Sequence, residues 1–335
     1  MPRRRETNEY SPRHEEKINY HGPLRAISEK ICREYGLGAF RSNKIIRRGY
    51  EDFNMRLVTS RGVYFVKIFA KHRDPRTPSI IVKAMELAMK AGVSTPKVHR
   101  SKKGYLTTIN LDGYKLKACV TDFIEGRTFW ELKKNLSISE IRFLARQAAK
   151  MNSINYKLVG GSGIWKNSWS RVNLPTAFRQ RGRYLTNAER RLVKPAVHEF
   201  RMLKVRTLPR SFAHVDIAAA NVIRDRRGRL WIVDFSGAYN YPRIFELAFF
   251  AKNFLVGQTK ADTEANLAVA LMEYQKILPL ERREVDALPV VIKCMAASAI
   301  VFFRSFNALF GRDVPETNKE YLKRDRATLR QLSGG

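Results

Sequence analysis

The sequence predicts an α+β protein with two lobes, a β-rich N-terminal lobe and a mainly helical C-terminal lobe. The chain has 335 residues, of which 44% are hydrophobic, so it is long enough for more than one domain of roughly 100 to 200 residues and for a sizeable core. Short β-branched and aromatic segments dominate before about residue 122, and helical periodicity dominates after it. We therefore expect a charged extension over residues 1–22, an N-terminal lobe over 23–122 and a helical lobe over 123–335.

The N-terminal lobe is expected to contain one antiparallel sheet. Its first helix should end near Gly36-Leu37-Gly38, and Ser60-Arg61-Gly62 is the clearest turn between strands. Asp112-Gly113 is a strong signal for a two-residue hairpin. The lobe should therefore have five strands, with one helix between the third and the fourth. The expected elements are a helix beginning at residue 24, strands over 44–49, 54–59 and 63–69, a helix over 78–90, and strands over 104–111 and 114–123.

The C-terminal lobe is expected to be mostly helical. Ser137 and Glu140 form a Ser-x-x-Glu capping box, which predicts a helix that continues through Lys150. Further helical patterns occur at about 187–204, 259–276 and 289–310. Residues 212–235 are the exception, because short apolar segments there are separated by polar and turn residues.

The chain is strongly basic, with 63 Lys and Arg against 31 Asp and Glu and a formal charge of +32. Residues 1–119 hold 26 basic and 11 acidic side chains, and the rest of the chain holds 37 and 20. The excess is therefore spread along the chain, and no zinc finger, RNP-type strand or helix-turn-helix pattern accompanies it. We expect weak, nonspecific attraction to nucleic acids.

The sequence predicts a cytoplasmic protein without a membrane span. Ser298 and Arg304 interrupt the longest apolar stretches, which fall short of the ~18 to 20 residues of a spanning helix, and no apolar signal core follows the basic N-terminus. Cys32, Cys119 and Cys294 are far apart and form no C-x-x-C pair. We expect them to be buried, and neither a disulfide framework nor a zinc site follows from their spacing.

One segment carries a pattern suited to phosphoryl transfer. His214-x-Asp216-x4-Asn221 is followed by a predicted hairpin that ends in Asp234-Phe235. A carboxylate at a loop tip can accept the proton of a substrate hydroxyl, and an amide oxygen with a second carboxylate can bind Mg²⁺. The pattern predicts Asp216 as the catalytic base and Asn221 and Asp234 as metal ligands. The alternative is that all three are ordinary turn residues, since Asp and Asn are common in turns.

These residues also resemble a known family. The resemblance is to the aminoglycoside phosphotransferase and choline kinase-like superfamily, and it rests on His214-x-Asp216-x4-Asn221, Val233-Asp234-Phe235 and Glu246-Leu247-Ala248. It implies a two-lobed protein-kinase-like fold, ATP and Mg²⁺ as cofactors, and transfer of the γ-phosphate to a hydroxyl of a small molecule. The implied acceptor is amino-alcohol-like, such as homoserine, choline or an aminoglycoside. Leu278–Ala297 resembles the homoserine-kinase-like branch.

The resemblance also implies a nucleotide site in the N-terminal lobe. Gly49–Phe69 is similar to the family's nucleotide loop and third strand, with Lys67 at the position of the ATP-phosphate lysine. Asp122, Phe123 and Ile124 correspond to the interlobe hinge, whose main chain receives adenine. Residues 23–122 would then bind the nucleotide, and 123–335 would hold the catalytic loop and the acceptor pocket. The alternative for Lys67 is a lysine on an edge strand that faces water.

Some positions depart from the family's pattern. Val215 stands where the family usually has Gly, and Glu246 stands where it usually has Asp. The helix glutamate that would pair with Lys67 is expected near position 83, which is Lys83, while Glu86 lies about one turn later. The loop from Arg48 to Asn54 is not a G-x-G-x-x-G. A pseudokinase is the alternative that these departures leave open.

Two further functions compete with the small-molecule kinase. The charge suggests a kinase of a protein or of an RNA-associated substrate, although the chain has no H-R-D, D-F-G or A-P-E motif. A catalytically weak module that binds a nucleotide or a nucleic acid is the other. Trp165 and Trp169, beside Gly160-Gly161-Ser162-Gly163, are either part of a substrate pocket or packing residues.

Overall fold

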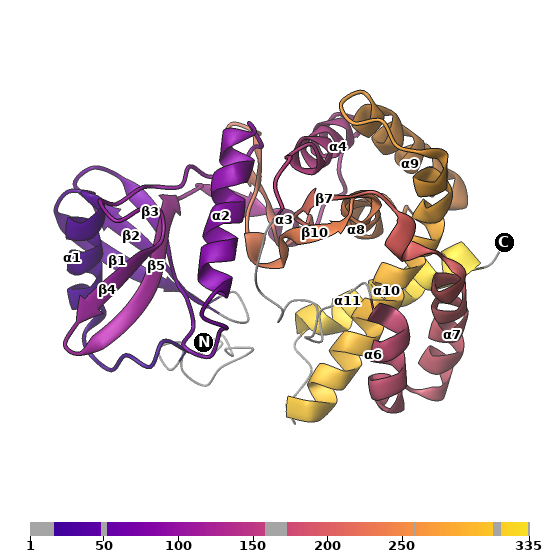
Figure 1. Ribbon diagram of the computed structural model, residues 1–335, viewed down its shortest axis with the longest axis horizontal. Helices are drawn as coiled ribbons and strands as arrows, with labels where there is room; N and C mark the ends of the chain where they lie inside the picture. The colour runs from indigo at the N-terminus through magenta and orange to yellow at the C-terminus, as the bar shows by residue number, and fades with distance from the viewer. Residues whose placement is uncertain (1–16, 48–51, 158–172, 258, 311–315, 334–335) are drawn as a thin grey trace, which may run out of the picture. The chain divides into compact units, whose positions relative to one another are not determined.

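The structure is a computed structural model, which describes residues 17–47, 52–157, 173–257, 259–310 and 316–333 (Figure 1). The chain divides into two compact units. Unit 1 comprises Met1–Lys90 and Thr95–Glu125, and unit 2 comprises Ala91–Ser94 and Gly126–Gly335. The predictions for the glycine-rich loop, for Trp165 and Trp169 and for residues 48–51 concern positions outside the described residues.

Unit 1 is built on one five-stranded antiparallel sheet with the order β1-β2-β3-β5-β4. The predicted five strands, with one helix between the third and the fourth, are confirmed. The first strand begins and ends earlier than predicted, at residues 40 and 46, and the fourth begins later, because Ser101 and Gly104 pair in a turn. The elements are α1 Leu24–Tyr35, β1 Phe40–Ile46, β2 Phe53–Thr59, β3 Val63–Ile68, α2 Thr77–Lys90, β4 Thr107–Leu111 and β5 Tyr114–Asp122.

The local chemistry of unit 1 explains these boundaries. Gly36 ends α1 in the left-handed region, at φ 64°, a conformation that costs glycine little. Asp112 and Gly113 both have positive φ, which suits the tight turn between β4 and β5. One face of the sheet then packs its apolar side chains, such as Met55 and Val66, against Ile27 and the rest of the buried face of α1.

Unit 2 is mostly helical and also contains the small sheets β10-β7 and β6-β8-β9. Its α-helices are α3 Phe129–Leu132, α4 Ile138–Asn152, α6 Leu174–Arg181, α7 Asn187–Met202, α8 Ile244–Phe254, α9 Lys260–Gln275, α10 Arg282–Phe310 and α11 Glu316–Ser333. Its strands and 3₁₀ turns are β6 Gly126–Thr128, η3 Gly182–Tyr184, η4 Val205–Thr207, β7 Arg210–Ala213, β8 Val222–Asp225, β9 Leu230–Ile232, η5 Phe235–Gly237 and β10 Tyr239–Pro242.

The predicted helices of unit 2 are present, and the structure adds others. The capping box of Ser137 and Glu140 begins α4 as predicted, and α7 and α9 match their predicted ranges within two residues. The helix predicted over 289–310 begins at Arg282, because Pro289 is accommodated inside it. Neither α6 nor α11 was predicted.

Helix α10 is longer than its interrupted apolar pattern suggests. Within the described residues, Arg282–Phe306 is one helical stretch that is long and apolar enough to cross a membrane. The sequence prediction that Ser298 and Arg304 make the apolar stretches too short did not anticipate this helix. However, 61% of its apolar window is buried inside the structure, as the core helix of a helical unit would be. The helix is therefore weak evidence for a membrane span.

Candidate active site

The loop after β7 brings the predicted base, Asp216, into contact with Asn221, one of the predicted metal ligands. The Nδ2 of Asn221 donates to Oδ2 of Asp216 at 2.8 Å and to the main-chain oxygen of Asp216 at 3.1 Å. Strands β8 and β9 form the predicted hairpin directly after Asn221. Because Asn221 binds both the main chain and the carboxylate of Asp216, the loop conformation and the direction of that carboxylate are fixed together.

The hairpin places Asp234 beside Asn221. The N–H of Val233 donates to the main-chain oxygen of Asn221 at 3.0 Å, so the residue opposite Asn221 directly precedes Asp234. Oδ1 of Asp234 accepts from the N–H and Oγ of Ser236, at 3.3 and 2.7 Å. A Cβ added at Gly237 would lie 3.2 Å from the main-chain oxygen of His214, a tight contact that could be accommodated only by a small shift of the loop.

Glu246 on α8 holds the same loop through the loop's main chain, a role that the sequence pattern did not predict. Its Oε2 accepts from the N–H of His214 at 2.5 Å and from the N–H of Val215 at 2.9 Å, and the residue is fully buried. Val215 has φ 48°, a strained conformation for a β-branched residue. Two hydrogen bonds to one carboxylate oxygen stabilise the loop in this conformation. Glu246 therefore reaches both N–H groups, although its side chain is one methylene longer than the Asp that the family usually has at this position.

The ring of His214 also stabilises the loop. Its Nδ1 accepts from the N–H of Asp216 at 3.2 Å, and its ring meets that of Phe235 edge to face at 4.5 Å between centroids. Through this hydrogen bond to the main chain, His214 has a structural role in the loop. The histidine acts on the position of Asp216 through this bond.

Lys67 lies in the interior of the sheet of unit 1. Its strand, β3, has neighbours on both sides, and the residue is only 8% exposed, so the alternative of an edge-strand lysine that faces water is wrong. The Nζ of Lys67 lies 3.4 Å from Oδ2 of Asp52. Glu86 on α2 instead accepts from Lys83 at 3.1 Å and from Lys90 at 2.6 Å.

Two main-chain N–H groups of the predicted hinge already donate hydrogen bonds within unit 1. The N–H of Asp122 donates to Lys97 and the N–H of Phe123 donates to Val63, at 3.0 and 3.2 Å. The carboxylate of Asp122 lies 2.6 Å from Nε2 of His99. In the described part of the chain, the N–H of Ile124 has no hydrogen-bond partner, so it is the donor of the three that a ligand could use.

The donor set around Asp216 suits a magnesium ion. No cluster of three or more His, Cys, Asp or Glu side chains that could hold a metal ion occurs among the described residues. Mg²⁺ needs only one or two protein carboxylates, because water and substrate phosphates fill its other positions. Since the amide nitrogen of Asn221 is committed to Asp216, its oxygen is the end that could join Asp234 on a metal.

Helix α11 brings an aromatic side chain into the electrostatic surroundings of Asp216. The pKa of the Tyr321 phenol is raised to about 12, mainly by burial; Arg324 opposes this shift, and the negative charge of Asp216 adds to it. The centroid of the Tyr321 ring lies 4.9 Å from that of the Trp130 ring, and the main-chain N–H of Trp130 donates to the main-chain oxygen of Ala219 in the catalytic loop. This neighbour of the site could not be predicted, because α11 itself was not.

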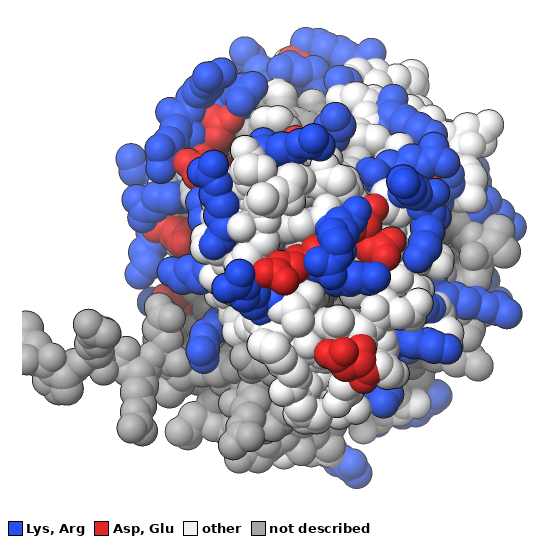
Figure 2. Space-filling model, turned by 90° about the vertical axis from the view of Figure 1, so that its left-hand side faces the viewer, with Lys and Arg blue, Asp and Glu red and all other residues white. Residues whose placement is uncertain are grey.

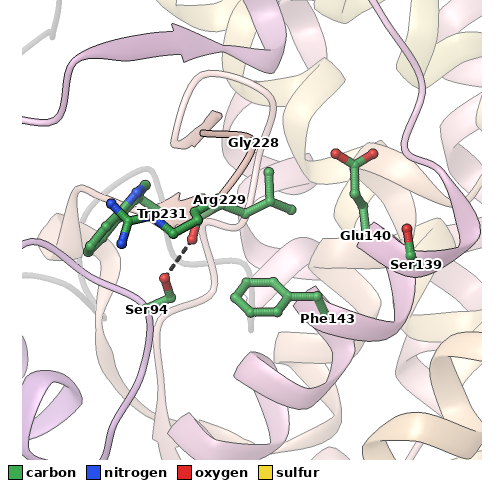
Figure 3. Close-up of a pocket in the computed structure, with 8 residues that line it drawn as sticks. Ser94, Ser139, Glu140, Phe143, Gly228, Arg229 and Trp231 are labelled. Atoms are coloured by element: carbon green, nitrogen blue, oxygen red, sulfur yellow. Dashed lines mark hydrogen bonds between the residues drawn. The ribbon is translucent and has the colours of Figure 1, made fainter. Parts of the chain in front are cut away.

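A cavity of about 460 Å³ lies elsewhere in unit 2. Figure 3 shows Glu140 and Phe143 of α4 with Arg229 and Trp231 of the hairpin around it, and the hydrogen bond from Ser94 that ties the neighbouring segment to β9. None of the predicted site residues lines this cavity. The candidate site is therefore defined by the loop contacts above.

Comparison with known proteins identifies the family. The model of the phosphotransferase enzyme family matches residues 42–288, which is most of the chain. The chain belongs to this phosphotransferase family. The predicted protein-kinase-like fold and the predicted enzyme class, a phosphotransferase with a hydroxyl group as acceptor, are thereby confirmed.

The curated relatives and solved structures agree with this family. A homoserine kinase of Parvibaculum lavamentivorans is 25% identical over 307 residues, covering 88% of this chain and 91% of the relative. A homoserine kinase of Brucella anthropi is 25% identical, with 78% of each chain covered. A microcompartment-associated aminopropanol kinase has a TM-score of 0.66 at 13% identity, covering 92% and 97% of the two chains. A spectinomycin phosphotransferase in complex with ADP and spectinomycin has a TM-score of 0.62 at 14% identity, with the same coverage.

Proposed function

We propose that this phosphotransferase transfers the γ-phosphate of ATP to the hydroxyl of a small amino alcohol in a Mg²⁺-dependent reaction, with homoserine as the first candidate acceptor. The observation that carries the proposal is the contact of Asp216 with Asn221 at 2.8 Å, in a loop that Glu246 holds through two main-chain donors. A fixed carboxylate next to an amide and a second carboxylate is the arrangement that this chemistry needs.

Asp216 is assigned the role of the base. Its carboxylate would accept the proton of the acceptor hydroxyl and keep the attacking oxygen in line with the phosphate. The hydrogen bond from Asn221 restrains one carboxylate oxygen, so the side chain does not have to be ordered when the acceptor binds. Asn221 and Asp234 are assigned to Mg²⁺, which would neutralise charge on the phosphate oxygens when bound.

The nucleotide is assigned to the N-terminal lobe, residues 23–122, with the adjoining hinge. Lys67 would contact the phosphates, and the N–H of Ile124 would bind the adenine edge in the segment Asp122–Ile124. Residues 123–335 would provide the catalytic loop and the acceptor pocket. A cytoplasmic location, where ATP and Mg²⁺ are abundant, stays a prediction.

The acceptor class is supported by the names of the similar proteins. Three curated relatives are homoserine kinases, and two of the similar structures are an aminopropanol kinase and a choline kinase of Streptococcus pneumoniae. Homoserine, aminopropanol and choline each carry a hydroxyl near a nitrogen cation. We infer that this chain takes an acceptor of the same kind.

The test is turnover of ATP with a panel of acceptors. Homoserine, choline, aminopropanol and spectinomycin are each incubated with ATP, with Mg²⁺ or with excess EDTA, and ADP and the phosphorylated product are measured. The proposal expects product with homoserine or another amino alcohol, and no product in EDTA. ATP binding without turnover of any acceptor would contradict it and favour a pseudokinase or a binding module.

The basic charge of the chain supports a nucleic-acid function less strongly than the loop geometry supports a small-molecule kinase. Figure 2 shows Lys and Arg side chains spread over the visible face, with Asp and Glu side chains between several of them. On α1, for example, Arg25 pairs with Glu29 at 2.8 Å, and Glu34 lies 3.5 Å from both Lys30 and Lys103. Such a surface suits weak binding that falls steeply with salt. Tight, sequence-selective binding at physiological salt would favour the nucleic-acid alternative instead.

A further inference from the structure

The ammonium group of Lys67 needs a fixed counter-charge, because its strand is interior and its side chain is nearly buried. Among the described residues of unit 1, two segments are candidates for this carboxylate. One is α2, where Glu86 is the only acidic residue. The other is the residue that directly precedes β2, Asp52, which lies next to the strand pair that contains Lys67.

The carboxylate of Glu86 is used by its own helix. It accepts from Lys83, one turn before it, at 3.1 Å and from Lys90, one turn after it, at 2.6 Å. Hydrogen bonding to Lys90 is the main reason why the pKa of Glu86 is lowered, so the group stays ionised with its own two lysines. Helix α2 therefore offers Lys67 no acidic partner.

Asp52 is instead held by donors on both of its oxygens. Oδ1 accepts from Nε of Arg73 at 2.6 Å and from the N–H of Ala70 at 3.1 Å, and Oδ2 accepts from Nη2 of Arg73 at 2.7 Å and from Lys67 at 3.4 Å. The residue is 2% exposed. Burial raises the pKa of Asp52, but the charges of Lys67 and Arg73 outweigh burial and lower it. The bidentate Arg73 fork fixes the carboxylate in one orientation.

We propose that Asp52 is the residue that positions Lys67 for the phosphates of the nucleotide, and that Arg73 holds Asp52 in place for this task. The inference rests on the proposed function, because it assumes that Lys67 contacts ATP. It places the positioning carboxylate beside β2 and its support in the segment after β3. In this chain, the geometry of the lysine is then independent of the single carboxylate on α2.

The first experiment compares two isosteric variants, Asp52→Asn and Glu86→Gln, by steady-state kinetics with ATP and the acceptor that the panel assay identifies. Loss of a residue that orients a functional group typically costs on the order of 10- to 100-fold in activity. We expect a loss of this size in kcat/KM for ATP in Asp52→Asn, with the KM for the acceptor unchanged. Glu86→Gln should stay within about two-fold of the wild type. Equal losses in both variants, or none in Asp52→Asn, would overturn the proposal.

The second experiment asks whether Asp52 acts through Lys67. If it does, the double variant Lys67→Met/Asp52→Asn should be no less active than Lys67→Met alone, because the first change already removes the group that Asp52 positions. Fully additive losses would overturn the proposal. A Lys67→Met variant with wild-type kinetics would instead contradict the assignment of Lys67 in the proposed function.

The folded state of each variant is checked by its thermal unfolding midpoint. If Asp52→Asn does not fold, Arg73→Lys tests the same link, since lysine keeps the charge but cannot form the bidentate fork. We then expect a raised KM for ATP and an unchanged KM for the acceptor. Wild-type values for both in Arg73→Lys would overturn the proposal.

Discussion

A buried hydrogen-bond relay connects the helical core of unit 2 with the strand that enters the catalytic loop. Oη of Tyr274 on α9 donates to Oδ1 of Asn152 on α4 at 2.7 Å, and Nδ2 of Asn152 donates to the main-chain oxygen of Phe212 on β7 at 2.8 Å. Phe212 is two residues before His214. Tyr274 is fully buried and Asn152 nearly so. The relay therefore fixes the start of the loop from inside the core.

Tyr274→Phe removes one hydroxyl from this relay and keeps the ring, so it creates almost no cavity. The cost is that the buried Oδ1 of Asn152 loses its donor, and leaving such an acceptor unsatisfied costs about 1 to 3 kcal/mol. For a unit of roughly 150 to 250 residues, each kcal/mol lowers the midpoint of thermal unfolding by about 2 to 4 °C. We expect a visibly lower midpoint.

The matched control is Tyr184→Phe in the same unit. Its hydroxyl accepts from Arg183 at 3.0 Å in an exposed pair, which should contribute within about 0.5 kcal/mol. The free energy of unfolding is measured for both variants by urea titration, and the midpoints by calorimetry. The reasoning is refuted if Tyr274→Phe loses no more stability than Tyr184→Phe.

Three other predictions concern the loop carboxylate, the thiols and the hairpin. Glu246→Ala removes the carboxylate that accepts from two buried N–H groups, so the free energy of unfolding from urea titration should fall by about 2 to 6 kcal/mol and kcat should fall too; full stability with full activity would contradict the loop assignment. Burial raises the pKa of Cys119 and of Cys294 to about 12, so neither thiol should react with Ellman's reagent until the protein is denatured, and a fast reaction of either in the native state would show that it is accessible. Burial raises the pKa of Asp225, but the indole N–H of Trp231 and other donors outweigh it and lower the pKa from 3.8 to about 2. The unfolded state therefore binds the proton more readily, and stability should be lost as the pH falls from about 4 toward 2; Asp225→Asn should show a smaller loss over this range in acid titrations, and an unchanged acid profile would refute the assignment.

Local signals explain which parts of the fold could be predicted. The Asp112-Gly113 turn predicted the β4–β5 hairpin, and the capping box of Ser137 predicted the start of α4. Both could be predicted because they depend on short-range interactions. Helix α11 was missed since its buried side chains, such as Leu322 and Leu329, are few among charged residues. Its stability depends on tertiary packing against α10, which no local pattern reports.

The candidate site also has one part that could be predicted from the sequence and one part that could not. The H-x-D-x4-N pattern placed Asp216 and Asn221 in one loop, and the structure adds a hydrogen bond between their side chains that the pattern did not predict. The part played by Asp52 could not be predicted, because it depends on Lys67 and Arg73, which are 15 and 21 residues away in the chain. From the sequence alone, an acidic residue in a loop cannot be distinguished from an ordinary turn residue, because its charged partners are brought near only by the folded sheet.

The most direct test of the assigned mechanism is the steady-state kinetics of Asp216→Asn with ATP, Mg²⁺ and the acceptor. Because the carboxylate acts on the hydroxyl mainly in the transition state, kcat should fall by on the order of 10² or more, with little change in the affinity for ATP. The amide is isosteric, so the loop should keep its contacts and the variant its unfolding midpoint. A folded variant with unchanged kcat, or one that loses ATP binding at normal kcat, would contradict the assignment of Asp216 as the base.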